Sequence, residues 1–394
     1  MSLMEASGGG SSPESVALGE ALTFFGDVSA FAAGAPSGEG ERIASLAAGM
    51  AQQAGLSVSD CHALYFAARL RLAGALGNHA LAKGDGLPDR AARMESWDVP
   101  AAGARLCERI DVLPKETADI VRWQAECWDG TGYPDQLRWS GIPKTAQVLH
   151  VAAAYVTAPD PQEAFTEITS QSGRAYSPEA ASAFTRWFHL NAGEIDAIDV
   201  PAEALRSGAF TPADAFALLA EGIDAHNATP GRSKRIAGHA TEIARSMNLS
   251  GTEAEALRLA ALLSGAGELR DREIESAQFA ALARLGIELR ARNAVTAADL
   301  LAACPQLQRA SEIVRARAEW YDGTGAPRRL RHEAIPVASQ ILGAVIAYDA
   351  LEEDHRTRIT EDRMLPISRI EKAAGTQFDP AVLRALAETV KARA

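Results

Sequence analysis

Apolar residues recur every three or four positions through most of this chain, and the runs end at glycine, asparagine or proline. This spacing places the apolar side chains along one face of an α-helix. The run ERIASLAAGMAQQAGLS, residues 41–57, keeps the spacing as far as Gly55, a typical helix stop. No stretch shows convincing apolar–polar alternation between hairpin signals. The pattern therefore predicts an all-α fold.

The helical pattern occurs twice in the same order. The run KRIAGHATEIARSMNLS, residues 234–250, repeats the run 41–57 at a distance of 193 residues. The loop WDGTGYP at 128–134 returns as YDGTGAP at 321–327, again 193 residues later. Each loop is followed by an Ile-Pro pair and a long apolar helix, and then by a Ser-Pro or Asp-Pro pair that reads as an N-cap before a further helix. Matched segments in one order indicate a tandem duplication.

The duplication divides the chain into two helical domains of similar plan. Residues 15–190 form the first and residues 212–394 the second, with a linker at 191–211 and a flexible Gly/Ser leader at 1–14. A repeat of this length is long enough for each copy to have its own hydrophobic core. We expect the two copies to pack on each other with pseudo-twofold symmetry, as the subunits of a homodimer do.

Composition narrows the class of protein. Apolar residues make up 47% of the chain and the formal net charge is -12, with no long basic run, which argues against a nucleic-acid partner. No signal peptide and no apolar run of about 18 residues is present, so we expect no membrane association and a cytoplasmic location. The four cysteines, Cys61, Cys107, Cys127 and Cys304, form no C-x-x-C pair and are expected to be reduced core residues.

The first loop and its surroundings carry a specific motif. Asp-Gly-Thr-Gly-Tyr-Pro at 129–134 is followed by a leucine, an Ile-Pro pair, a long apolar helix and a Gly-x-x-Tyr-x-Pro motif; the second copy differs mainly at Ala326, which stands in the tyrosine place. This combination resembles the HD-GYP subgroup of the HD-domain phosphohydrolases over nearly all of both halves. The resemblance implies an all-helical fold, two or three metal ions and hydrolysis of cyclic di-GMP.

The resemblance also implies a set of metal-ligand positions, and the histidines and aspartates of the family are missing from them. In the first copy these positions fall on Glu39, Gly74, Ala75, Val99, Gln124, Ala125 and Ala153, and in the second on Arg232, Ser264, Gly265, Asn293, Arg317, Ala318 and Ile346. The lysine that closes the His-Asp motif falls on Asn78 and Glu268. Of the family pattern only the glutamate before each loop remains in both copies, as Glu126 and Glu319.

The histidines support the same interpretation without reference to a family. The eight histidines are never closer than 13 residues in sequence, so no two lie one turn apart on a helix. Hydrolysis by a pair of metal ions needs several histidine and carboxylate ligands that converge. We therefore expect no metal, no cofactor and no catalytic residue.

The two loops have a structural interpretation that requires no chemistry. Their aspartate, glycines and proline favour a tight turn that holds the flanking helices at a fixed angle. The alternative interpretation is a recognition surface for a protein or a nucleotide. Its candidate residues are Asp129, Gly130, Tyr133 and Pro134 in the first copy, and Arg317, Glu319, Asp322, Arg328, Arg329 and Arg331 in the second.

Arg317 stands where the resemblance implies a ligand histidine. The preferred account is an internal ion pair with Glu319 or Asp322, which replaces the charge of the lost metal. An anion-binding pocket is the second account. In the first copy the positions around the former site are small, and we expect Trp123 or Trp128 to fill it.

These features predict a catalytically inactive HD-GYP-like signalling module that binds a protein partner in a bacterial pathway of the cyclic di-GMP type. Two alternatives stay open. One is a metal-dependent cyclic di-GMP phosphodiesterase with an atypical site. The other is a non-hydrolytic sensor that binds a cyclic dinucleotide through Arg317 and the arginines at 328–331.

Overall fold

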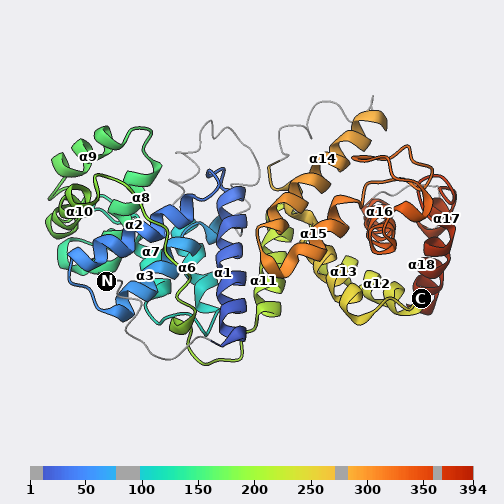
Figure 1. Cartoon of the computed structure of the whole chain (residues 1–394), viewed down its shortest axis with the longest axis horizontal. Helices are drawn as coiled ribbons and strands as arrows, with labels where there is room; N and C mark the ends of the chain where they lie inside the picture. The colour runs from blue at the N-terminus through green and yellow to red at the C-terminus, as the bar shows by residue number, and fades with distance from the viewer. Residues whose placement is uncertain (1–11, 77–97, 271–282, 358–365, 394) are drawn as a thin grey trace. The chain divides into compact units, whose positions relative to one another are not determined.

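The computed structural model describes residues 12–76, 98–270, 283–357 and 366–393 (Figure 1). Within these ranges the chain forms α-helices, 3-10 turns and loops, and β pairing is limited to two isolated bridges, Ser172 with Tyr176 and Ala374 with Phe378. The all-α prediction is confirmed. The predicted leader falls mostly on residues outside the described ranges, and the first helix already begins at Pro13.

The contacts divide the chain into two compact units, Met1–Ala215 (unit 1) and Phe216–Ala394 (unit 2). The helices of unit 1 are α1 (Pro13–Ala32), α2 (Glu39–Gln53), α3 (Val58–Leu70), η2 (Ala73–Ala75), α6 (Asp98–Glu108), α7 (Thr117–Trp123), η3 (Trp139–Gly141), α8 (Lys144–Thr157), α9 (Pro161–Ser170), α10 (Pro178–Asn191) and η4 (Ala202–Ala204).

The core of unit 1 lies where α2, α3 and α8 meet. These three helices pack against one another, and α7 and α10 cover their outer faces. Met50 on α2, Phe66 on α3 and Leu149 on α8 are fully buried. Each buried side chain of this size contributes about 1.5–3 kcal/mol to folding. Three site residues described below lie on or next to these helices: Glu39 at the start of α2, Arg71 directly after α3 and His150 within α8.

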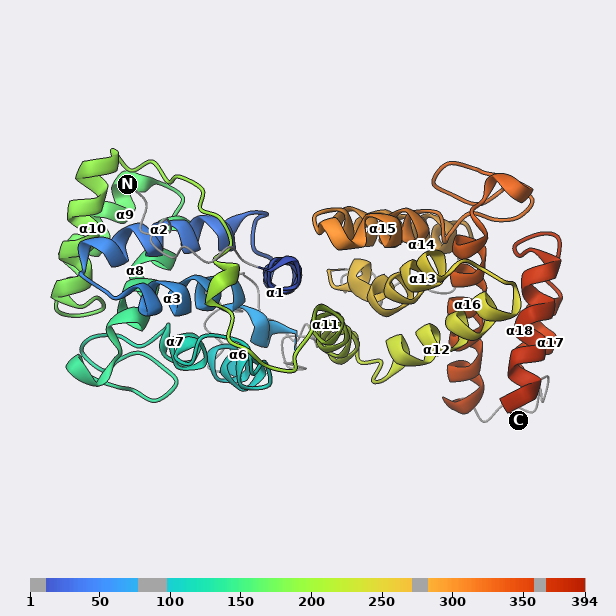
Figure 2. The same cartoon turned by 60° about the horizontal axis from the view of Figure 1, so that its bottom comes forward.

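Unit 2 repeats this plan, as the sequence predicts. Its helices are α11 (Pro212–His226), whose first turn precedes the division, α12 (Arg232–Ser246), α13 (Gly251–Leu263), η5 (Ser264–Glu268), α14 (Ala283–Ala302), η7 (Pro305–Leu307), α15 (Gln308–Arg315), η8 (His332–Ala334), α16 (Val337–Thr357), α17 (Pro366–Glu371) and α18 (Pro380–Arg393). The long helix α16 packs against α12, α13, α15 and α18 (Figure 2).

The predicted helix ends are confirmed by their backbone geometry. Gly55 after α2 and Asn248 after α12 both have left-handed φ values, 67° and 56°, which stop the two equivalent helices. Ser177 caps α10 by accepting a hydrogen bond from the N–H of Ala180 at 3.1 Å, with proline at the first helical position.

The segment 191–211, predicted as a linker, lies against unit 1. Its short helix η4 packs on α1. The N–H of Arg206 donates to the carbonyl of Val112 at 2.7 Å, and the hydroxyl of Tyr155 donates to the carbonyl of Gly193 at 3.2 Å. This segment is thus part of the packed structure of unit 1.

Two of the four cysteines are core residues as predicted. Cys107 and Cys304 are buried, whereas Cys61 and Cys127 are only partly buried, and all four are free thiols. Burial raises the pKa of Cys107 to about 12, so its thiol stays protonated. Among the described residues no helix is both long and apolar enough to cross a membrane.

Candidate functional site

A glutamate holds each DGTG loop in place. The side chain of Glu126 is buried, and its carboxylate accepts hydrogen bonds from the backbone N–H groups of Asp135 at 2.7 Å and Leu137 at 3.0 Å. In unit 2 the carboxylate of Glu319 accepts two equivalent N–H bonds, at 2.6 and 3.0 Å. Burial raises the pKa of Glu126, although the amide hydrogen bonds oppose the shift. Both carboxylates are therefore committed to their own loops.

The aspartate of each loop closes a local turn. Oδ1 of Asp129 accepts hydrogen bonds from the hydroxyl of Thr131 at 2.6 Å and from its N–H at 3.0 Å. Asp322 makes the same pair of bonds with Thr324, at 2.7 and 2.9 Å. These hydrogen bonds lower the pKa of both carboxyl groups. The arrangement is an Asx-turn, which fits the structural interpretation of the loop.

An arginine side chain packs against one glycine of each loop and leaves no room for a Cβ there. Gly130 and Gly323 have φ values of 83° and 82°. A Cβ on Gly130 would lie 2.4 Å from the side chain of Arg138, and one on Gly323 would lie 2.2 Å from that of Arg331. Arg331, a predicted binding residue, therefore covers its loop in the same way as Arg138, its equivalent in unit 1.

The other predicted loop residues lie on the same turns. The N–H of Tyr133 donates to the carbonyl of Ala125 at 3.2 Å, and the bond from Tyr133 to Pro134 is cis. Arg328 and Arg329 are exposed, and Arg329 has a left-handed φ of 56°. Of the predicted site residues, the structure brings only Arg317 and Glu319 together in the lining of a cavity.

Unit 1 has a buried ion pair at the former ligand positions. Glu39, the first residue of α2, lies 3.4 Å from Arg71, which follows α3, measured from Oε1 to Nη2. The two side chains are 4% and 5% exposed. The side-chain amide of Gln124 donates to the carbonyl of Arg71 at 2.9 Å. A fixed guanidinium thus stands among the positions where the family resemblance implies metal ligands.

The structure corrects the sequence alignment of the two copies in the segment that contains Arg71. Gly74 and Gly267 occupy equivalent positions in the two units. The evidence is that at each glycine the backbone of a following helix comes equally close. A Cβ on Gly74 would lie 2.1 Å from the carbonyl oxygen of Val99, and one on Gly267 would lie 2.0 Å from that of Asn293. The two glycines are 193 residues apart, the same distance as the two loops.

With these glycines matched, the His-Asp positions of the first copy move by three residues. Arg71 and Leu72 correspond to Ser264 and Gly265, which also follow directly after a helix end. The placement of the His-Asp pair on Gly74 and Ala75 was therefore wrong. The lysine position likewise moves to Ala75, and Asn78 lies outside the described residues.

His150 fills part of the site in unit 1. Its ring is partly buried, its Nδ1 lies 2.9 Å from the carbonyl oxygen of Glu126, and it contacts the ring of Tyr176 edge-on at 5.1 Å. Burial lowers its pKa. Trp123 or Trp128 was expected here, but the indole N–H of Trp123 donates to Asp135 of the loop at 2.8 Å, and Trp128 lies at the base of the loop, where its backbone N–H donates to the carbonyl of Ala175 at 3.1 Å.

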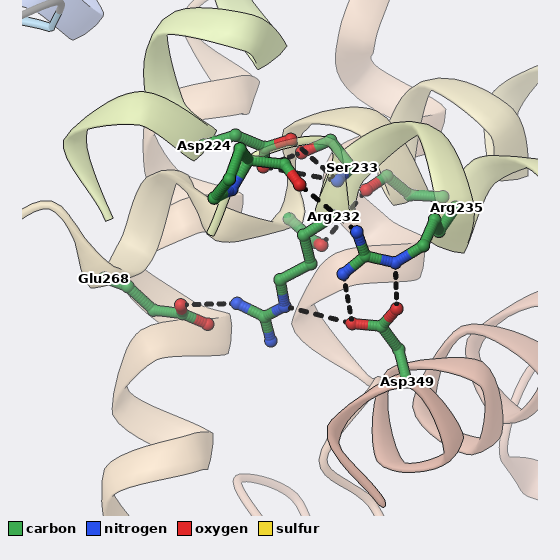
Figure 3. Close-up of polar contacts among 9 residues, drawn as sticks. Asp224, Arg232, Ser233, Arg235, Glu268 and Asp349 are labelled. Atoms are coloured by element: carbon green, nitrogen blue, oxygen red, sulfur yellow. Dashed lines mark hydrogen bonds and ion pairs between the residues drawn. The ribbon is translucent and has the colours of Figure 1, made fainter. Parts of the chain in front are cut away.

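Unit 2 connects the same helix ends through a network of charges (Figure 3). Asp349 on α16 is buried and accepts hydrogen bonds from Arg235 at 2.8 and 3.4 Å. Nε of Arg232 lies 3.7 Å from Asp349, and its Nη1 lies 2.8 Å from the carboxylate of Glu268. Arg232 occupies the place that Glu39 has in unit 1, so the sign of the charge is reversed there.

The same network fixes the start of α12. Asp224 on α11 is buried and accepts hydrogen bonds from the hydroxyl of Ser233 at 2.7 Å and from its N–H at 3.0 Å (Figure 3). Burial raises the pKa of Asp224, while Ser233 and the nearby arginines act in the opposite direction. Arg232 is thereby held at the N-terminus of a well-anchored helix.

A cavity of about 210 Å³ lies beside this network in unit 2. Its polar lining includes Arg232, Arg290, Asn293 and Arg317. Burial lowers the pKa of Arg317 to about 10, and the charges of Glu268 and Arg232 also act on it, so its guanidinium lies near these groups. Arg317 therefore remains a cation at neutral pH.

The preferred prediction for Arg317 was wrong. Within the described ranges its side chain makes no hydrogen bond or ion pair with Glu319 or Asp322, because backbone amides and a threonine already occupy these carboxylates. The second account was an anion-binding pocket; Arg317 does line a cavity, and the binding of an anion there stays a prediction.

The residues at these sites do not fit a di-metal centre. A guanidinium has no lone pair to offer a cation, and one occupies a former ligand position in unit 1 and two do so in unit 2. Among the described residues, no three His, Cys, Asp or Glu side chains are grouped to hold a metal ion. The two remaining glutamates accept backbone amides instead.

Several of these residues escaped sequence reasoning. Arg71 was missed because the alignment was shifted, and Arg290 because no motif marks it. His150 was passed over because it matches no ligand position; its equivalent in unit 2, 193 residues later, is Gly343, which lines the cavity. The Tyr-Asp pair at 348–349 in the second long helix, absent from the first, was a visible signal for Asp349.

Comparison with known proteins identifies relatives of this arrangement. A cyclic di-GMP phosphodiesterase of Thermotoga maritima is 31% identical over 166 residues, which cover 37% of this chain and 43% of that protein. The 3'3'-cGAMP-specific phosphodiesterase 3 of Vibrio cholerae is 25% identical over 287 residues, covering 66% of this chain and 60% of that protein. The chain thus spans about half the length of the curated relatives it matches.

The fold has a solved counterpart. The crystal structure of a cyclic GMP-AMP specific phosphodiesterase of V. cholerae, V-cGAP3, superposes with a TM-score of 0.66 at 19% sequence identity, over 95% of this chain and 97% of that one. At this identity the likeness concerns the fold alone. Residues 30–179 and 218–382 each match the HD domain family. Because these two matches cover most of the chain, one in each unit, the protein belongs to the HD domain family.

Proposed function

We propose that this chain is a signalling protein of the HD domain family that acts by binding and does not hydrolyse cyclic dinucleotides. The observation that carries the proposal is the placement of guanidinium groups at former metal-ligand positions. Arg71 has this role in unit 1, and Arg232 and Arg317 have it in unit 2.

Electrostatics supports this reading. Two unit charges about 4 Å apart interact by about 4 kcal/mol at the effective dielectric constant of a protein surface. A divalent cation beside Arg317, which has no ion-pair partner among the described residues, would therefore meet a repulsion of up to about twice that size; at Arg71 and Arg232 the paired carboxylates Glu39 and Glu268 reduce the repulsion. Phosphodiester hydrolysis by a metal pair needs cations to polarise the phosphate and to lower the pKa of a bound water. A site that repels cations supplies neither effect.

Turnover of cyclic dinucleotides tests the proposal. The full chain is incubated with cyclic di-GMP and with 3'3'-cGAMP in the presence of Mn²⁺ or Fe²⁺, with the T. maritima relative as a positive control. We expect no linear dinucleotide or mononucleotide above a protein-free blank. Metal-dependent product formation at a rate near that of the control would overturn the proposal.

A second candidate is a metal-dependent phosphodiesterase with an atypical site. The similarity to two curated relatives named as cyclic dinucleotide phosphodiesterases favours this alternative. It requires ligands other than the histidines of the family. The turnover experiment separates the two candidates directly.

We further propose that the binding function is directed at a protein partner of a cyclic dinucleotide pathway, through the first loop of unit 1. Trp139 supports this surface, since it is 59% exposed and its backbone N–H donates to the carbonyl of Trp128 at the loop base, at 3.0 Å. Exposed tryptophans are enriched among the residues that dominate binding at interfaces.

Affinity capture with matched variants tests the partner surface. Tagged wild type, Trp139→Ser and Leu190→Ser are compared in cross-linked cells; Leu190 is 70% exposed on α10 and serves as the control. We expect a signalling protein captured by wild type and by the Leu190 variant to be lost from the Trp139 variant. An identical set of proteins from all three would contradict this surface.

A further inference from the structure

Three arginines line the cavity of unit 2, and two of them have no partner within the described ranges. Arg232 is bound to Glu268 and lies near Asp349. Arg290 and Arg317 make no hydrogen bond or ion pair with any described residue, although both line the same cavity. The cavity therefore holds two guanidinium groups whose N–H donors have no acceptor among the described residues.

The carboxylates that line the cavity form their hydrogen bonds and ion pairs with other groups than Arg317 and Arg290. Glu268 receives the guanidinium of Arg232 at 2.8 Å. Glu319 accepts two backbone amides of its loop. Asp379 accepts the N–H of Ala381 at 2.6 Å and so caps the start of α18. Each acid already has its own donor, so the N–H groups of Arg317, although near the charge of Glu268, remain available to a ligand.

A buried amide adds a second polar group without a partner. Asn293 is 8% exposed, lines the cavity, and its Oδ1 has no hydrogen-bond partner in the described part of the chain. A buried unsatisfied polar atom costs about 1–3 kcal/mol. A half-turn of the amide presents Nδ2 as a donor, so this side chain can serve an anion beside Arg317.

The size and the walls of the cavity limit the ligand. Its volume of about 210 Å³ exceeds the roughly 150 Å³ of an engineered cavity that holds benzene, and it lies below the roughly 300–1,000 Å³ typical of pockets for drug-sized ligands. Trp320, Ile346 and Phe378 form an apolar wall. Space remains for one ring-sized group next to an anion.

We propose that the unit 2 cavity binds a small phosphate monoester, with its phosphate at Arg317 and Arg290 and its organic group against Trp320 and Phe378. This inference rests on the proposed function, because the phosphate occupies space that metal ions would otherwise need. Guanidinium groups suit this ligand, since their paired N–H donors match two phosphate oxygens. The unit 1 counterpart of Arg317 is Gln124, and His150 stands where unit 2 has Gly343, so the site belongs to unit 2 alone.

Calorimetric titration of the full chain in excess EDTA tests the inference. The probes are phenyl phosphate, inorganic phosphate, benzyl alcohol and cyclic di-GMP. We expect phenyl phosphate to bind more tightly than inorganic phosphate, and benzyl alcohol, which lacks the phosphate, not to bind. Absence of phenyl phosphate binding up to millimolar concentration, or binding of cyclic di-GMP alone, would overturn the proposal.

Two variants assign the binding to the cavity. Arg317→Gln places the unit 1 residue in unit 2, and we expect it to weaken phenyl phosphate binding at least about tenfold. Arg315→Gln is the matched control, because Arg315 is near the same helix end but bonds to Asp299 at 2.6 Å and does not line the cavity. If both variants bind phenyl phosphate with equal affinity, the anion binds elsewhere and the inference is wrong.

The outcome is distinguishable from failure of the proposed function. EDTA removes metal-dependent binding, and product formation is measured separately with cyclic dinucleotides. If the chain neither turns over cyclic dinucleotides nor binds phenyl phosphate, the proposed function stands and only this inference is wrong. A chain that turns over cyclic dinucleotides loses the proposed function.

Discussion

The guanidinium of Arg71 lies 3.4 Å from the carboxylate of Glu39, and both side chains are almost completely buried. In unit 2 the place of Glu39 is taken by Arg232, which has Glu268 as its partner at 2.8 Å. The two copies thus hold opposite charges at the same position. Each copy neutralises the position internally, by an ion pair of its own.

Breaking the Arg71–Glu39 pair should destabilise unit 1 strongly. Arg71→Met leaves the carboxylate of Glu39 buried without its cation, and removing one member of a buried pair costs about 3–5 kcal/mol. The free energy of unfolding, measured by urea denaturation followed by circular dichroism, should fall by this amount.

A surface pair provides the control for that loss. Arg122 bonds to Asp135 at 2.7 Å, and both side chains are about one third exposed. Arg122→Met should cost about 1 kcal/mol or less. The double variant Arg71→Met/Glu39→Leu should recover most of the stability, because no charge remains buried. A double variant as unstable as Arg71→Met would argue against the ion pair as the cause.

Gly343, the unit 2 equivalent of His150, should tolerate no side chain. A Cβ on Gly343 would lie 2.6 Å from the carbonyl oxygen of Arg317. Gly343→Ala should therefore cost about 1–3 kcal/mol through overpacking. Gly251→Ala, on the first turn of α13 with nothing within 4 Å of its Cβ, is the control and should be neutral or slightly stabilising. Equal effects of the two substitutions on the thermal midpoint would contradict the close contact.

The helices and their caps could be predicted from sequence, because their signals are local. Ser177 with its following proline, and Gly55 at a helix end, are defined by neighbouring residues. The alignment of Gly74 could not be predicted in this way. Two glycines, Gly74 and Gly77, compete in the sequence, and the choice depends on the approach of the backbone at Val99, which is distant along the chain.

The absence of the family's ligand residues could be predicted from sequence, but the contacts of the residues at their positions could not. The missing histidines are visible in the sequence alone. That Arg317 has no hydrogen-bonding partner among the described residues was not, because the two candidate carboxylates lie close in sequence yet are already bonded to the N–H groups and threonine of their own loop. Which charges meet inside a protein depends on helices that are brought together by packing.

His150 should make stability depend on pH. Burial lowers its folded-state pKa below the value of about 6.5 for an unfolded histidine. As pH falls through 6.5, the unfolded chain gains a proton that the partly buried ring, facing the carbonyl of Glu126 and the ring of Tyr176, does not take up. Stability is then lost by about 1.4 kcal/mol per pH unit, until the folded-state pKa is reached.

Denaturation of wild type and His150→Gln at a series of pH values between neutral and acid measures this contribution. The difference in unfolding free energy between the two proteins should narrow or reverse as pH is lowered, since glutamine does not titrate. A constant difference across the series would show that His150 is not the group responsible.

The loop glutamates should matter for folding and not for chemistry. Glu126→Gln replaces one acceptor oxygen by an amide NH2 group, a donor that faces a backbone N–H, and should cost about 1.5–3 kcal/mol. Glu179→Gln, in an exposed pair with Lys144, is the control and should cost about 1 kcal/mol or less. Thermal unfolding compares the two, and a similar small shift for both would remove the structural role assigned to Glu126.

The central claim, that arginines have replaced the metal centre in both units, is tested most directly by the metal content of the purified chain. Plasma mass spectrometry after dialysis against Mn²⁺, Fe²⁺ or Zn²⁺ without chelator should give far less than one ion per chain. One or more ions per chain, retained through gel filtration, would contradict it.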